Sequence, residues 1–167
     1  VTGTDAGNYT FNTTATTAAD ITARALTVSA TGQNKVYDGT TNATVTLGDN
    51  RVAGDNLSLA GTASFLNKNV GTAKTVNVTG INVTGTDAGN YTFNTTATTA
   101  ADITARALTV SATGQNKVYD GTTNATVTLG DNRVAGDNLS LAGTASFLNK
   151  NVGTAKTVNV TGINVTG

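Results

Sequence analysis

The chain has 167 residues, ten basic and ten acidic, and therefore no formal net charge; it contains no His, Cys, Met, Pro or Trp. Without His and Cys it lacks the usual ligands for zinc, copper and iron, and it cannot perform thiol or imidazole catalysis. The few Lys and Arg residues are scattered, and no apolar run approaches the length of a membrane helix. We therefore expect no nucleic-acid partner and no membrane insertion.

Apolar and polar residues alternate over short segments, which is typical of β-strands with one buried face. Between residues 26 and 103 these segments are, in chain order, residues 26–30, 43–47, 57–65, 76–83 and 91–103. Within the fourth segment the alternation slips by one position at Gly80, which predicts a β-bulge there. Clusters of Asn, Asp and Gly lie between the segments and predict tight turns, with one at residues 87–90.

Thr makes up about a fifth of the chain, and Asn and Gly are also abundant. These residues disfavour helices, whereas the regular alternation favours packed strands over disorder. Five to seven short strands per unit predict an all-β protein made of small, Ig-like β-sandwich domains. A β-grasp-like repeat is the alternative, and we disfavour it because no segment predicts a helix.

Residues 83–164 repeat residues 1–82 without a single substitution, and residues 165–167 begin a third copy. A catalytic site gains little from unchanged duplication, whereas a stalk, fibre or multivalent binder gains length or avidity from each copy. We therefore expect a structural array and no enzyme.

The first predicted strand of each unit follows Ala23, which sets the expected domain boundaries. Residues 1–22 are then the C-terminal strand of a preceding repeat, residues 23–104 a complete repeat domain, and residues 105–167 the next repeat without its last strand. The sequence of that last strand is present at the other end of the chain. Either the protein continues in both directions, or chains complete one another head to tail by strand exchange and form filaments.

Four motifs recur in the same order in both copies. In the first copy they are residues 25–28 (ALTV), 35–41 (KVYDGTT), 67–72 (NKNVGT) and 87–91 (DAGNY). This order resembles the YDG-type repeat domain of large bacterial surface and secreted adhesins of the filamentous haemagglutinin-like kind. The resemblance implies a tandem stalk module that lies outside the cell or on the bacterial surface, serves adhesion or biofilm formation, and has no catalytic activity.

We expect a structural role for the Tyr-Asp-Gly motif. Gly39 would supply an unusual backbone angle, Asp38 would accept hydrogen bonds from N–H groups of the turn, and Tyr37 would pack its ring and anchor its hydroxyl. The same roles fall to the second copy of the motif, Tyr119, Asp120 and Gly121. The alternative is that Tyr37 belongs to a binding surface.

Calcium is the one metal that the composition allows, because it binds oxygen ligands. The weak candidates are Asp5, Asp38, Asp49 and Asp55. No loop has the dense Asp spacing of a dedicated calcium site, so we expect no cofactor. Asn-X-Ser/Thr sequons offer possible glycosylation sites at Asn8, Asn12, Asn42, Asn56, Asn77 and Asn82, and again one period later.

The leading functional hypothesis is a spacer in the stalk of an adhesin. Its expected partners are neighbouring identical repeats and other copies of the chain, with a host or matrix surface reached through a distal region that is not part of this sequence. Two alternatives stay open: a subunit of an extracellular filament assembled by strand exchange, and a multivalent carbohydrate- or protein-binding module.

Overall fold

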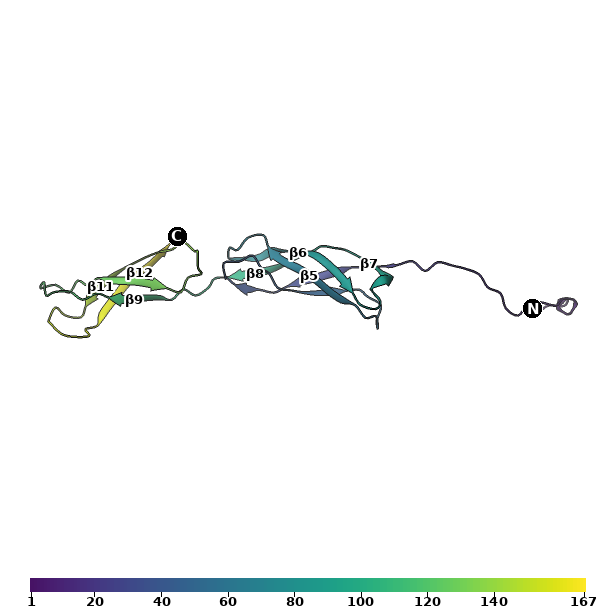
Figure 1. Ribbon diagram of the computed structural model, residues 1–167, viewed down its shortest axis with the longest axis horizontal. Helices are drawn as coiled ribbons and strands as arrows, with labels where there is room; N and C mark the ends of the chain where they lie inside the picture. Colours follow the sequence, from purple (N-terminus) through teal and green to yellow (C-terminus); the bar gives the residue numbers. More distant parts are fainter.

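A computed structural model describes residues 1–167 and shows two groups of strands that lie end to end, preceded by an extended N-terminal segment (Figure 1). The first strand group contains β1 (Arg24–Leu26), β2 (Val28–Gly32), β3 (Lys35–Val36), β4 (Val45–Asp49), β5 (Ser58–Phe65), β6 (Gly71–Thr84), β7 (Tyr91–Phe93) and β8 (Ala97–Thr104). The second strand group contains β9 (Val110–Gly114), β10 (Val127–Asp131), β11 (Ser140–Phe147) and β12 (Val158–Thr166). The remaining elements are two short 3₁₀ turns, η1 (Ala6–Asn8) and η2 (Ala88–Asn90). The prediction of an all-β protein is confirmed.

Strand β8 holds the first strand group together. It lies between β3, with which it pairs in parallel, and β6, with which it pairs antiparallel, in the order β3-β8-β6-β5. Strands β2 and β4 form an antiparallel pair, and β1 pairs in parallel with β7. Strands β1 and β3 therefore pair with strands that come late in the chain, β7 and β8, so the fold closes only when these two strands are in place.

The predicted bulge at Gly80 is present in β6. Between the pairs Ala60–Asn82 and Thr62–Thr79, β6 contains one residue more than β5. Gly80 has a φ of 62°, a left-handed conformation that glycine adopts without the steric cost of a side chain. The extra residue moves the apolar face by one position, so β6 buries side chains on both sides of the bulge.

The single strand predicted for residues 91–103 is wrong, because β7 and β8 are separated at Asn94. The Asn94 side chain accepts a hydrogen bond from Val28 N–H at 2.8 Å and donates to the Val28 carbonyl at 3.0 Å and to the Thr96 carbonyl at 2.7 Å. The amide side chain thus takes the place of backbone ladder bonds and breaks the strand. The sequence also gave no indication of the short strand β3.

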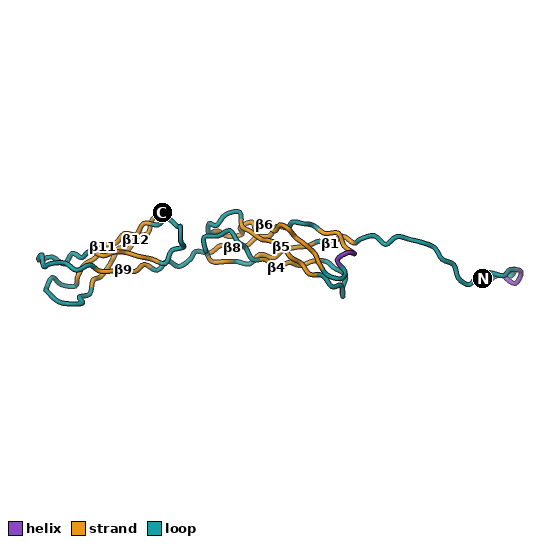
Figure 2. Tube along the Cα trace, viewed as in Figure 1, coloured by secondary structure: helices purple, strands orange, loops and turns teal.

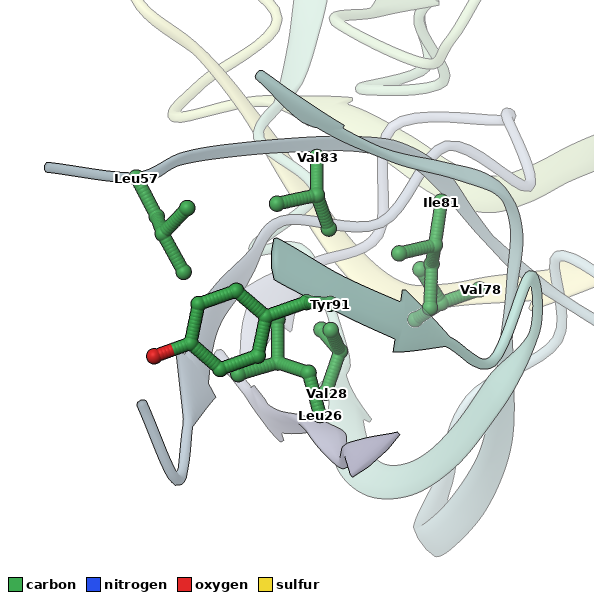
Figure 3. Close-up of a cluster of buried hydrophobic side chains, with 7 residues drawn as sticks. All are labelled: Leu26, Val28, Leu57, Val78, Ile81, Val83 and Tyr91. Carbon is green, nitrogen blue, oxygen red and sulfur yellow. The ribbon is translucent and has the colours of Figure 1, made fainter. Parts of the chain in front are cut away.

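The buried residues of the protein are all apolar and all lie in the first strand group. One core cluster, drawn in Figure 3, contains Leu26, Val28, Leu57, Val78, Ile81, Val83 and Tyr91. The other contains Phe65, Val76, Ala101 and Ile103. Strands β6 and β8 contribute side chains to both core clusters. Burial of these side chains is therefore the main source of hydrophobic stabilisation.

The second strand group repeats the sequence of residues 23–85 but has no closed core. It consists of the pairs β9–β10 and β11–β12, and no strand lies beside β12 in the position of β8. None of the core residues that recur 82 positions later is buried there. Ile163 and Val165, for example, are 47% and 38% exposed, whereas Ile81 and Val83 are 3% and 6% exposed. Closure of the core therefore depends on the last two strands.

Residues 9–22 have the sequence of β7 and β8 but form no strand (Figure 2). Their large side chains Tyr9, Phe11 and Ile21 are exposed. A strand needs a neighbouring backbone to satisfy its N–H and C=O groups, and this segment has none in the structure. The structure contains no helix with the length and hydrophobicity needed to cross a membrane.

Candidate functional site at the junction between the strand groups

The turn that contains the Tyr-Asp-Gly motif is held together by Lys35. Its Nζ donates hydrogen bonds to Asp38 Oδ1 at 2.8 Å, to the Thr40 carbonyl at 2.9 Å and to the Asn42 carbonyl at 2.9 Å. Asp38 Oδ1 also accepts hydrogen bonds from the backbone N–H and the hydroxyl of Thr40, both at 2.9 Å. Lys35 and Asp38 thereby fix the turn that follows β3.

The hydrogen bond from Lys35 is the main reason that the pKa of Asp38 is lowered to about 2, and the bonds from Thr40 lower it further. The second copy of the motif repeats this network except for the bond to the asparagine carbonyl. Lys117 donates to Asp120 at 2.8 Å, and the pKa of Asp120 is also lowered to about 2. Because the second copy has no following strand group, the turn is built by its own repeat.

Tyr37 extends from the same turn into the second strand group. Its hydroxyl donates a hydrogen bond of 2.8 Å to Oδ1 of Asp137. Lys68 Nζ lies 3.1 Å from the same oxygen and 5.7 Å from the centre of the Tyr37 ring. The hydrogen bonds from Tyr37 and then Lys68 lower the pKa of Asp137, so the carboxylate is charged when it is held by these two residues.

Gly39 brings the two backbones together at the same place. Its φ is 79°, and a Cβ added to it would lie 2.7 Å from Cγ1 of Val134. Gly121 has almost the same φ, 77°, but a Cβ there would meet nothing within 4 Å. Glycine is therefore required at position 39 for two reasons: the turn needs a positive φ, and the next strand group leaves no room for a side chain. We call this set of contacts, made by Tyr37, Gly39 and Lys68 with Val134 and Asp137, the junction.

The two copies of the motif tyrosine differ only in their surroundings. Tyr37 is half-buried at the junction, whereas Tyr119, which has no following strand group, is 58% exposed. The tyrosine at the start of the turn is thus available to the next repeat.

The first-group counterpart of Asp137 is Asp55, and it has a different partner. Asp55 Oδ2 accepts a hydrogen bond from the hydroxyl of Tyr91, and that hydroxyl accepts one from Val52 N–H at 2.9 Å. Figure 3 shows the Tyr91 ring against the apolar cluster with its hydroxyl at the edge. The same aspartate position therefore makes two kinds of contact. In the first repeat it accepts a hydrogen bond from Tyr91 in β7 of its own repeat, and in the second repeat it accepts one from Tyr37 of the preceding repeat.

The family model of the YDG domain matches residues 22–100 and 104–167. The chain belongs to the YDG domain family. No curated protein and no solved structure matches the chain. The two matched segments contain the two copies of the YDG turn, and the junction lies between them.

The candidate calcium ligands are dispersed in this YDG protein. Asp38 is bound by Lys35, Asp49 by the guanidinium of Arg51, and Asp55 by Tyr91. Asp5 is exposed and precedes η1 without capping it. The structure brings no three acidic side chains to one place. That the protein needs no calcium stays a prediction, which chelation experiments can test.

The sequons lie in different environments. Five of the six asparagines are exposed: Asn8, Asn12, Asn42, Asn56 and Asn82. Asn77 is half-buried in β6, where it pairs with Ser64 on one side and Thr98 on the other. Glycosylation acceptors are usually exposed in loops, so Asn77 is the least suitable of the six.

Four residues of the YDG turn and the junction were not predicted from the sequence: Lys35, Lys68, Val134 and Asp137. The spacing of Lys35 and Asp38 carried a local signal for their ion pair. Lys68 and Asp137 carried no such signal, because they lie 69 residues apart and meet only when two repeats are placed end to end.

Proposed function

We propose that the chain is a non-catalytic spacer in the stalk of a bacterial cell-surface or secreted adhesin that acts in adhesion or biofilm formation. In this proposal each 82-residue repeat is a small Ig-like β-sandwich. Residues 23–104 are one complete domain, residues 1–22 are the last strand of a preceding domain, and residues 105–167 are a domain that lacks its last strand. The exact tandem repeat and membership of the YDG family support it.

The observation that carries the proposal is the junction. Two residues of one repeat hold a charged carboxylate of the next, with Tyr37 and Lys68 at 2.8 and 3.1 Å from Asp137. Hydrogen bonds to an ionised group are stronger than those between neutral groups, and two donors on one oxygen restrict rotation more than a single donor does. A spacer needs such a restriction, because only then does each added repeat extend the stalk by a constant length, roughly 30–40 Å for a compact unit of this size.

In this account adhesion itself belongs to another part of the adhesin. The YDG repeats carry the tip outward and need no ligand site of their own. A host or matrix surface is then a partner of the distal region, and the partners of the repeats are other repeats.

The proposal is tested by varying the number of repeats between a cell anchor and a terminal epitope on a Gram-negative cell. Super-resolution imaging of the epitope should show its height increasing by the same increment with each repeat. A matched series in which every Tyr37-type residue is Phe should reach lower mean heights with a wider spread. Repeats without a tip should not bind glycans or matrix proteins; if they bind, and binding strengthens with repeat number, the multivalent binding module replaces the spacer.

A further inference from the structure

The first strand group begins and ends with two segments, residues 24–37 and 91–104, that run parallel to each other. Strand β1 pairs with β7, and β3 pairs with β8, both in parallel. Paired residues are 67 positions apart in the first pair and 68 in the second, so the register changes by only one residue over the length of the group. We call this parallel pairing the clamp.

Side chains bridge the two segments where neither strand pair is present. Asn94 accepts a hydrogen bond from Val28 N–H at 2.8 Å and donates one to the Val28 carbonyl at 3.0 Å. Further along, Gly32 N–H donates to the hydroxyl of Thr99 at 3.2 Å. The contact between the segments therefore continues between β1–β7 and β3–β8.

The clamp is also closed at the end that faces the second strand group. Asp102 N–H donates to Oδ1 of Asn34 at 2.7 Å, and Asn34 donates in return to Oδ2 of Asp102 at 3.4 Å. Beyond β3, Tyr37 N–H donates to the Thr104 carbonyl at 2.9 Å. The first and last segments of the group are thus bonded to each other from one end to the other.

The chain enters and leaves this strand group at opposite ends of the clamp. The extended N-terminal segment joins it at β1, and the second strand group follows β8 at the other end (Figure 1). A pull along the chain draws residues 24–37 toward the N-terminal segment and residues 91–104 toward the second strand group. Because the two segments are parallel, these pulls act along the strands in opposite directions, and the hydrogen bonds between them are loaded together in shear. In an antiparallel pair pulled apart at its open end, the bonds would instead break one after another.

We propose that the repeat bears tension, and that the clamp is the part of the fold that resists it. A single hydrogen bond stabilises little, but bonds that must break in the same step slow forced unfolding together. Sliding the segments also pulls Leu26 and Ile103 out of the core, where they are 3% and 1% exposed. The proposal concerns the pairing within one repeat and does not rest on the spacer function.

Optical tweezers on single molecules of the full chain test the proposal. The chain has no Cys, so Ala23→Cys and Ala105→Cys, both at exposed positions, attach handles to opposite ends of the clamp. Asn90→Cys in place of Ala105→Cys moves the second handle to the end where β7 begins, and the pull then peels the segments apart. We expect a several-fold higher mean unfolding force when the handles are at opposite ends, with a contour-length gain of roughly 230–260 Å. Equal forces in the two geometries would overturn the proposal.

Two neighbouring substitutions provide the second measurement. Asn34 is exposed and bonds to Asp102 within the clamp, whereas Gln33, also exposed, bonds to Thr46 outside it. Asn34→Ala should lower the unfolding force with the handles at opposite ends and change it little in the peeling geometry. Gln33→Ala should leave both forces unchanged. An effect of Asn34→Ala that is equal in both geometries would indicate a general loss of stability and would overturn the proposal, as would no effect in either.

Discussion

The hydroxyl of Tyr37 donates a hydrogen bond of 2.8 Å to Asp137, 100 residues further along the chain. Asp55 has the same place in the nearer repeat, but it accepts its hydrogen bond from Tyr91. A carboxylate has two oxygens and about four lone-pair sites. In a continuous array one aspartate can therefore accept hydrogen bonds from both tyrosines, which would connect closure of one repeat to its contact with the preceding repeat.

Substitution of Gly39 tests the close contact at the junction. Gly39→Ala places a Cβ at 2.7 Å from Val134 Cγ1 and also strains the backbone at a φ of 79°. The left-handed conformation alone costs about 1–2 kcal/mol, and overpacking adds about 1 kcal/mol or more. In a double-mutant cycle by urea unfolding, Val134→Ala should remove the overpacking part and give a coupling of about 1 kcal/mol.

Gly121→Ala is the matched control for that cycle. Gly121 has the same strained φ but no neighbour within 4 Å, so its substitution should combine additively with Val134→Ala. If the effects of Gly39→Ala and Val134→Ala on the free energy of unfolding were also additive, the close contact between Gly39 and Val134 would be contradicted.

Acid titration tests the ion pair between Lys35 and Asp38 in the YDG turn. The pKa of Asp38 is lowered from 3.8 to about 2, mainly by Lys35, so the folded carboxylate binds its proton less readily than the unfolded one. The stabilisation is therefore complete above the unfolded pKa and is lost as the pH falls from about 4 through about 2. Lys35→Met should return the pKa of Asp38 toward its usual range.

NMR titration of the carboxyl carbons measures this effect in both turns at once. In Lys35→Met the pKa of Asp120 should stay at about 2, because Lys117 still binds it. A low pKa of Asp38 without Lys35 would show that another group stabilises the carboxylate.

The repeated sequence allows a test of core burial with an internal control. Ile103 is 1% exposed in β8, so Ile103→Ala should lower the free energy of unfolding by about 2–4 kcal/mol. Ile21 has the same sequence neighbours but is fully exposed, and Ile21→Ala should change stability by less than about 0.5 kcal/mol. Urea unfolding of the dilute chain measures both. Equal losses would mean that residues 9–22 are also packed.

Local features of the fold were predictable from the sequence, and contacts between repeats were not. Alternation identified the strand positions now seen as β2, β4 and β5, and the phase slip identified the bulge at Gly80, because both depend on near neighbours. The break at Asn94 was missed because its amide binds Val28, 66 residues away. The junction was missed for a further reason: with identical repeats, nothing in the sequence distinguishes Asp55 from Asp137 as the partner of Tyr37.

Metal removal tests the remaining cofactor candidate. Asp38, Asp49 and Asp55 already accept hydrogen bonds from Lys35, Arg51 and Tyr91. A calcium ion would have to displace these donors, so we expect the same Tm in calcium and in an excess of chelator. A Tm that rises with calcium and falls again on chelation would establish a site that the sequence and the structure do not indicate.

The most direct test of the account is the distribution of distances between the two strand groups. The chain has no Cys, so Thr44→Cys and Thr126→Cys provide two exposed, equivalent sites for spin labels. Double electron–electron resonance, with labelled protein diluted in unlabelled protein, should give a narrow distribution. Tyr37→Phe should broaden it, and Tyr119→Phe, the same substitution without a following repeat, should leave it narrow. A distribution that is equally wide in all three proteins would contradict a junction held by Tyr37 and Asp137.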